Sequence, residues 1–289
     1  VMLKNNGVLP LQIPATGDYK VVIIGEHQTN SYLGLYSSEQ RHAEDDKWRI
    51  WIGPGIEQAI KDVNPNATVT RINSNTISNE DAIRAADAVI VVTGTGSGYS
   101  SEGRDRSNTD LPNNQAQLIS NVGKMNPNTV CVMETCGPMT VTAFENDVAA
   151  ILWSSFGGIR KGVGFGHVIT GKVNPSGHLT ATWHQSMNDI PGIRDYNLYA
   201  TNGSHGRTYM YYDGTVPVSY PFGYGLSYTT FAYSNLKIDK TAYDANDTVK
   251  VTFDVKNTGS VTGKDVAQLY VAQPDAPAGL PRSIRSRKV

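Results

Sequence analysis

The sequence predicts an α/β fold, a three-layer αβα sandwich around a mainly parallel sheet, followed by an incomplete all-β sandwich. Short continuous runs of β-branched residues, as in residues 20–25, are typical of parallel strands that are covered on both faces. These runs alternate with segments of helical periodicity, the pattern of a sheet packed between helices. After Phe231 apolar residues alternate with polar ones instead, which favours strands with one solvated face.

The first part of the sandwich is expected to contain two strands with a helix between them. The strands are predicted at residues 20–25 and 67–72. Parallel strands need a crossover, and a helix is the usual one. The connecting segment supplies it, because four of its apolar residues recur at helical spacing. They are Ile56, Ala59, Ile60 and Val63.

The rest of the sandwich follows the same alternation. Ser78 is predicted to cap a helix, because Asp81 lies three positions further on, and a strand is expected at residues 88–92. Pro112 suits the first turn of the next helix. Strands are further predicted at residues 129–133, 149–153 and 179–183, and a glycine-rich helix at residues 158–169.

We therefore expect three segments. The α/β sandwich domain is assigned to residues 1–188, and residues 189–232 are predicted to form an extended arm, rich in Tyr, Gly and Pro, packed on it. Residues 233–289 contain the beginning of a β-sandwich, with Val249, Val251, Phe253 and Val255 on one side of a strand. Such sandwiches need about seven strands, and this segment provides far fewer.

Composition excludes several classes of function. The chain has 289 residues and a net charge of −1, so nothing favours a nucleic-acid or membrane-surface partner. No apolar run is long enough for a membrane span. Cys131 and Cys136 lack the spacing of a zinc or redox motif, and both are expected to be buried thiols. Localisation stays open, with a secreted or periplasmic location favoured over a cytoplasmic one.

The sequence lacks the motifs of three kinds of site. The glycine-rich residues 93–98 do not match the dinucleotide fingerprint, and no Walker lysine follows them. The six histidines are scattered without the spacings that bring metal ligands together. No Gly-x-Ser-x-Gly elbow marks a serine hydrolase. The sequence therefore predicts neither a metal nor a cofactor.

The long segment at residues 26–47 has no clear period, which in a compact domain is typical of a functional or mobile loop. It contains Tyr32, Tyr36, His27 and His42. Two interpretations stay open for these residues, contacts to a bound sugar and ordinary surface positions.

Glu102 is the candidate for acid/base chemistry. It lies between the predicted strand at residues 88–92 and the next helix, and ligands of parallel α/β sheets bind beyond the carboxyl ends of the strands. Glycoside hydrolysis needs two carboxyl groups, so one glutamate is half of that mechanism. From these residues alone, a surface glutamate paired with Arg104 is the favoured interpretation.

Four stretches of the chain change that balance. They are Leu-Lys-Asn-Asn-Gly-Val-Leu-Pro-Leu at residues 3–11, Glu-Gly-Arg-Asp-Arg at residues 102–106 with the Leu-Pro of residues 111–112, Gly-Lys-Val-Asn-Pro-Ser-Gly-His-Leu at residues 171–179, and residues 220–229. In their joint order and spacing they resemble the C-terminal region of family 3 glycoside hydrolases. The turn at residues 153–158 departs from that family, because a proline and a polar residue are lost.

The resemblance implies that Glu102 is the catalytic acid/base of a retaining β-glycosidase. It also implies a barrel domain, missing from this chain, that carries the aspartate nucleophile, so the isolated chain is expected to be inactive. Residues 233–289 would then begin a fibronectin type III-like domain. The residues expected to bind substrate or support the loop are Ser101, Arg104, Asp105, Tyr32 and Tyr36.

The substrates that the resemblance implies are β-linked glucosides or xylo- and gluco-oligosaccharides, and the protein partner is the missing barrel domain. A β-glucosidase acting on terminal β-D-glucosyl residues is the main hypothesis. A β-xylosidase is the alternative within the family. A non-catalytic carbohydrate-binding or scaffolding module is the alternative from a different class.

Overall fold

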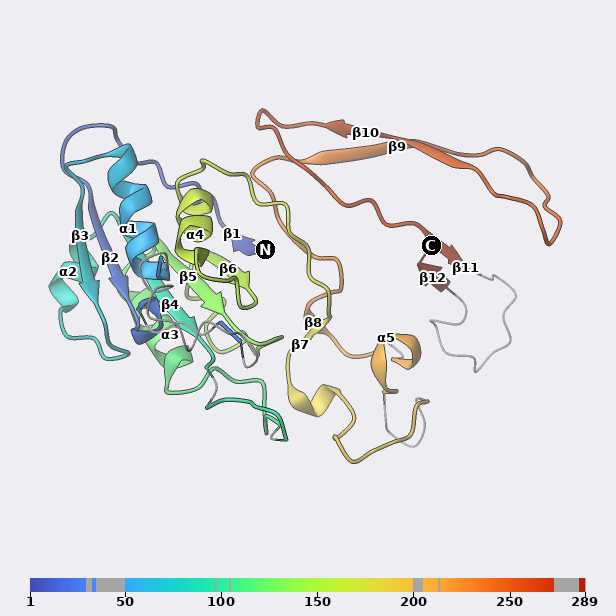
Figure 1. The fold of residues 1–289 in the computed structure, drawn as a ribbon, viewed down its shortest axis with the longest axis horizontal. Coiled ribbons are helices and arrows are strands. Elements are labelled where there is room, and N and C mark those ends of the chain that lie inside the picture. Colours follow the sequence, from blue (N-terminus) through green and yellow to red (C-terminus); the bar gives the residue numbers. More distant parts are fainter. Residues whose placement is uncertain are drawn as a thin grey trace.

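The fold is described from a computed structural model, which covers residues 1–29, 33–34, 50–96, 98–103, 105–199, 205–212, 214–272 and 286–288 (Figure 1). Its centre is a six-stranded sheet in the order β1-β6-β5-β4-β2-β3. Five strands run parallel, and β1 at the edge pairs antiparallel with β6. The strands are β1 Met2–Asn5, β2 Lys20–Ile24, β3 Thr68–Ile72, β4 Ala88–Gly94, β5 Thr129–Glu134 and β6 Ala150–Ser154.

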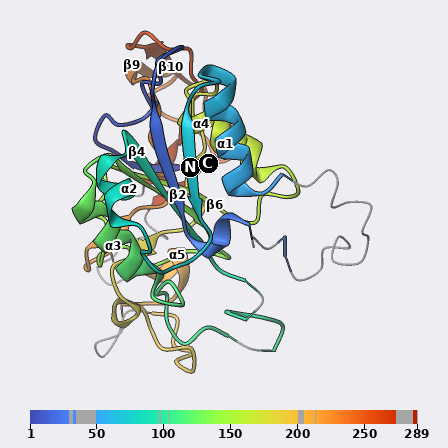
Figure 2. The same cartoon turned by 90° about the vertical axis from the view of Figure 1, so that its left-hand side faces the viewer.

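Helices cover both faces of this sheet (Figure 2). One face packs against α1 Ile52–Val63 and α4 Lys161–Ile169, and the other against α2 Glu80–Ala85 and α3 Gln115–Met125. Every residue of β4 and β5 is buried, which explains why both strands appear in the sequence as continuous apolar runs. The predicted three-layer sandwich is confirmed.

Glycines allow α1 and α4 to pack closely. A β-carbon added to Gly55 would lie 2.3 Å from the carbonyl carbon of Gly162, and one added to Gly166 would lie 2.7 Å from the carbonyl oxygen of Gly55. The two helix backbones therefore meet where these residues have no side chain. This contact explains why α4 is rich in glycine.

Three predicted helix starts are wrong by a few residues. Asn79, rather than Ser78, caps α2, because its side-chain oxygen accepts a hydrogen bond of 3.0 Å from the backbone nitrogen of Ala82. Helix α3 begins at Gln115 after a left-handed Asn114, so Pro112 lies ahead of the helix. Helix α4 likewise begins after the glycines of residues 157–158.

The strand predicted at residues 179–183 does not join the main sheet. Only β7 Trp183–His184 is extended there, and it pairs with β8 Val218–Tyr220 in a separate two-stranded sheet. The strand that completes the main sheet is β1, which the apolar pattern did not predict. The backbone nitrogen of Leu226 donates a hydrogen bond of 2.8 Å to the carbonyl oxygen of Met2, so Leu226 lies beside the free side of β1.

The remaining elements are short or project outward. They are η1 Glu26–Gln28, η4 Met187–Asp189, α5 Thr208–Tyr211, β9 Phe231–Ile238, β10 Val251–Asn257, β11 Tyr270–Ala272 and β12 Ser286–Lys288. Strands β9 and β10 form an antiparallel hairpin that extends away from the sandwich (Figure 1). Large apolar side chains of the hairpin are exposed, Leu236 at 66%. The boundaries at residues 188 and 232 stay predictions.

Candidate active site

Glu102 lies in the loop of residues 95–114, which leaves the carboxyl end of β4 and leads to α3. Its side chain is exposed, as is that of Asp105, while Ser101 is half-buried. Gly103 has a φ of 73°, a left-handed conformation that glycine adopts without strain. Glu102 is therefore presented to solvent at a sharp turn. Arg104, Tyr32 and Tyr36 lie outside the described residues.

The loop is attached to the segment after β5 on both sides of Glu102. Before it, the hydroxyl of Ser100 donates to the sulfur of Cys136 over 3.7 Å. After it, the Nη1 of Arg106 donates to the carbonyl oxygen of Pro138 over 2.9 Å and lies 3.6 Å from the sulfur of Met139. These contacts restrain the ends of the turn while its tip stays open.

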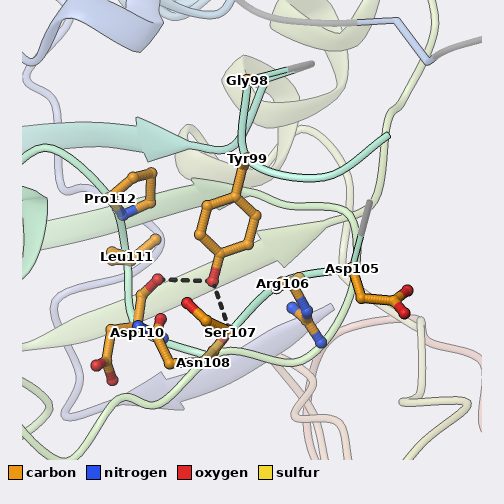
Figure 3. Close-up of a pocket in the computed structure, with 9 residues that line it drawn as sticks. All are labelled: Gly98, Tyr99, Asp105, Arg106, Ser107, Asn108, Asp110, Leu111 and Pro112. Atoms are coloured by element: carbon orange, nitrogen blue, oxygen red, sulfur yellow. Dashed lines mark hydrogen bonds between the residues drawn. The ribbon is translucent and has the colours of Figure 1, made fainter. Parts of the chain in front are cut away.

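Tyr99 holds the second half of the same loop. Its hydroxyl lies 3.0 Å from the carbonyl oxygen of Asn108 and 2.8 Å from that of Asp110, and both carbonyls share it as a donor (Figure 3). Burial raises the pKa of Tyr99, so the phenol keeps the proton that these bonds require. The guanidinium of Arg106 lies 5.9 Å from the centre of the Tyr99 ring.

A cavity of about 410 Å³ opens beside Tyr99 and is lined by residues of this loop. Asp105 and Arg106 form one part of its wall, and Leu111 and Pro112 another (Figure 3). The mixture of a carboxylate, a guanidinium, hydroxyl groups and an aromatic ring is suited to binding sugar hydroxyl groups and ring faces. Asp105 is the predicted site residue that this cavity includes.

A buried ionic cluster, here called the Glu134 centre, lies at the carboxyl end of β5 and consists of Glu134, His27 and Lys161. The Nζ of Lys161 is 2.5 Å from one carboxylate oxygen of Glu134, and the Nε2 of His27 is 3.1 Å from the other. The backbone nitrogen of Gly157 donates to the carboxylate over 3.3 Å. The three side chains are 0%, 7% and 3% exposed, in the order in which the centre is defined.

The sequence did not predict this cluster. His27 was considered only as a sugar contact or a surface residue, and Glu134 and Lys161 were not candidates. The sequence does indicate where Glu134 lies. This residue directly follows the apolar run of residues 129–133, which places it at the same sheet edge as the Glu102 loop. What the sequence does not show is the pairing, since His27 and Glu134 are 107 positions apart.

The structure also bears on the predictions for the two cysteines, for metal sites and for membrane-spanning helices. Cys131 is buried and Cys136 half-buried, both are free thiols, and burial raises the pKa of Cys131 to about 12. Within the described ranges, no group of three or more His, Cys, Asp or Glu residues is arranged to hold a metal ion. In the same part of the chain, no helix combines the length and the apolar character that crossing a membrane requires.

Comparison with known proteins gives consistent matches. Residues 1–228 match the model of the glycosyl hydrolase family 3 C-terminal domain. The chain is 31% identical over 286 residues to a protein of Formosa agariphila named beta-xylosidase, and 34% identical over 212 residues to a protein of Aspergillus clavatus named probable beta-glucosidase I. These alignments cover 96% and 70% of this chain but only 39% and 25% of the relatives.

A solved structure, the beta-D-glucoside glucohydrolase of Trichoderma reesei, superimposes with a TM-score of 0.77 at 26% identity. The superposition covers 100% of this chain and 46% of that one. The chain thus spans less than half the length of each of these three proteins.

Proposed function

The chain belongs to glycosyl hydrolase family 3, and from this premise we propose that it supplies the general acid/base of a retaining, exo-acting β-glycosidase. The observation that carries the proposal is the exposed carboxyl group of Glu102, held on a turn whose two ends are hydrogen-bonded to the segment after β5. An acid/base must reach a substrate held outside its own domain. An exposed side chain on a restrained loop meets this requirement.

In the proposed reaction, Glu102 first acts as an acid. Its carboxyl proton passes to the glycosidic oxygen while the bond from that oxygen to the anomeric carbon breaks and a second carboxylate bonds to that carbon. Glu102 then acts as a base, taking a proton from water as the water oxygen displaces the second carboxylate. The sugar leaves with its original β configuration, and Glu102 is again protonated.

The second carboxylate must lie about 5–5.5 Å from Glu102 in a retaining enzyme. We assign it to a barrel domain outside these 289 residues, and the length of the relatives is in keeping with that assignment. Terminal β-D-glucosyl residues are the proposed substrate, because relatives and structural neighbours are named beta-glucosidases. A β-xylosidase is the second candidate, favoured by the name of the Formosa agariphila relative.

The test is Glu102→Ala in the complete enzyme. General acid assistance is worth about a hundred- to ten-thousand-fold, so hydrolysis of a β-linked disaccharide should fall by that order. An aryl β-glucoside with an acidic phenol should react nearly normally in the first step, because its leaving group departs as the anion. Added azide should restore turnover and give the β-glucosyl azide, since azide attacks without a base.

Two controls accompany this variant. Asp105→Ala removes another exposed carboxylate of the same loop, and Glu80→Ala removes an exposed glutamate on α2. Neither should show azide rescue. Equal losses on both substrates without rescue in Glu102→Ala would refute the role of Glu102. Rescue in Asp105→Ala would transfer the role to that residue, and an inactive full-length parent would favour a non-catalytic module.

A further inference from the structure

A contribution to the stability of the fold does not explain why the Glu134 centre is buried. Glu134, His27 and Lys161 are all buried, and taking two opposite charges out of water costs about as much as their attraction returns. Replacing such pairs with apolar residues of similar size is often neutral or stabilising. A buried ionic cluster at the functional edge of a sheet therefore calls for another role.

The centre joins two loops at that edge to the end of β5. His27 belongs to η1, directly after β2. Lys161 is the first residue of α4, and Gly157 lies in the loop between β6 and α4. Glu134, at the end of β5, contacts all three through its carboxylate. One carboxylate thus fixes the positions of the loops that follow β2 and β6.

The same residue also holds the start of the Glu102 loop. The backbone nitrogen of Thr95, the first residue after β4, donates to the carbonyl oxygen of Glu134 over 3.0 Å. In return, the backbone nitrogen of Cys136 donates to the hydroxyl of Thr95 over 3.0 Å. Cys136 then accepts from Ser100, two positions before Glu102. A continuous series of hydrogen bonds leads from the centre to the catalytic turn.

Gly94 packs directly against the Glu134 centre. A β-carbon at Gly94, the last residue of β4, would lie 2.2 Å from the Nε2 of His27 and 2.5 Å from the carbonyl oxygen of Glu134. The backbone of Gly94 therefore lies against both residues with no room for a side chain. Any shift of His27 or Glu134 must move the point from which the Glu102 loop leaves the sheet.

We propose that the Glu134 centre is a positioning device, in which Glu134, His27 and Lys161 fix the Glu102 loop relative to the loops after β2 and β6. The proposal rests on the acid/base role proposed for Glu102. These residues do not touch substrate, because their side chains are buried. They act through the placement of Glu102, and a displacement of about 1 Å in a catalytic group can cost on the order of a hundredfold in rate.

The first test compares two replacements of His27 in the complete enzyme. His27→Leu removes the hydrogen bond to Glu134, whereas His27→Gln places an amide nitrogen at nearly the same reach from the backbone. We expect the Leu variant to lose about tenfold or more in kcat on a β-linked disaccharide, with KM changed less than about twofold. The Gln variant should retain most of the parent kcat. Equal kcat in both variants would overturn the proposal.

The second test separates positioning from stability. The double variant Glu134→Gln with Lys161→Met removes both buried charges together, so its melting temperature should stay close to that of the parent. Its kcat should nevertheless fall like that of His27→Leu. The matched control, Glu80→Gln with Arg84→Met, removes an exposed pair and should change neither quantity. A double variant with parental kcat would refute the proposal. If it does not fold, the His27 pair decides.

A third measurement does not depend on the proposed function. In the 289-residue chain, His27→Leu should accelerate amide hydrogen exchange at Thr95 and Gly157 relative to His27→Gln, because both amides are bonded to Glu134. Unchanged exchange would show that the centre does not hold these loops. Faster exchange together with a negative Glu102→Ala result would retain the positioning and reject only the acid/base role.

Discussion

Helix α4 offers a paired substitution whose two members should have opposite effects on stability. Gly162 and Gly164 lie two positions apart in the same helix. A β-carbon at Gly162 would lie 2.0 Å from the carbonyl oxygen of Trp51 and 2.9 Å from that of Ile50, while one at Gly164 would have no heavy atom within 4 Å. The same added methyl group thus meets the backbone before α1 in one case and open space in the other.

The magnitudes follow from these surroundings. Backbone atoms cannot rotate away, so Gly162→Ala must separate α1 from α4, and overpacking of this kind costs about 1–3 kcal/mol. Gly164→Ala should stabilise the protein by about 0.5–1 kcal/mol, because alanine has the higher helix propensity and reduces the entropy of the unfolded chain. The two variants should therefore differ by roughly 1.5–4 kcal/mol in the free energy of unfolding.

Urea denaturation followed by circular dichroism measures this difference, with thermal melting as a second method. Each kcal/mol should shift the melting temperature by about 2–4 °C in a domain of this size. Two variants of equal stability, or a less stable Gly164→Ala, would refute the view that α1 and α4 meet backbone to backbone. An unchanged slope with urea is needed for the comparison, since a changed slope would mean a different unfolded state.

Three further predictions concern activity, the hairpin and pH. The 289-residue chain alone should not hydrolyse aryl β-glucosides, and any turnover by it would contradict the assignment of the second carboxylate to another domain. Amides of β10, whose residues from Thr252 onward are exposed, should exchange faster than those of the buried β4, and equal protection would disprove this. Burial raises the pKa of Tyr228, so the stability it contributes is complete below its unfolded pKa of about 10 and is lost as pH rises through the folded value. Tyr228→Phe should therefore lose less stability than the parent above about pH 10 in alkaline unfolding, and identical losses would refute the assignment.

The strands of the sandwich could be predicted because their burial is recorded in the apolar pattern. The run at residues 88–92 is β4, buried along its whole length, and the prediction differs from the structure only at the end of the strand. Strand β1 was missed because only Met2 and Leu3 of its four residues are buried, so it has no long apolar run. Helix starts were misplaced because Ser78 and Asn79 are both good caps, and only the hydrogen bond to Ala82 distinguishes them.

The candidate site could be predicted in part. The position of Glu102 follows from the alternation of strands and helices, which places its loop at the carboxyl edge of the sheet. The Glu134 centre could not be predicted in the same way, because it depends on which side chains of η1, β5 and α4 meet in three dimensions. The order of strands in the sheet decides this, and in this sheet β4 lies between β2 and β5. Tyr32 and Tyr36 lie outside the described residues, so their role in binding substrate stays a prediction.

The antiparallel edge strand has a consequence for how such a domain is joined to others. Met2 pairs with Leu152 of β6 on one side and bridges to Leu226 on the other. The first and last segments of the region that matches the family are therefore neighbours in space. A unit whose entrance and exit lie side by side can be spliced into a longer polypeptide, or have its order in the gene rearranged, without being stretched open. Fusing residues 226 and 2 through a short glycine linker and opening the chain in an exposed loop would make that portability directly measurable.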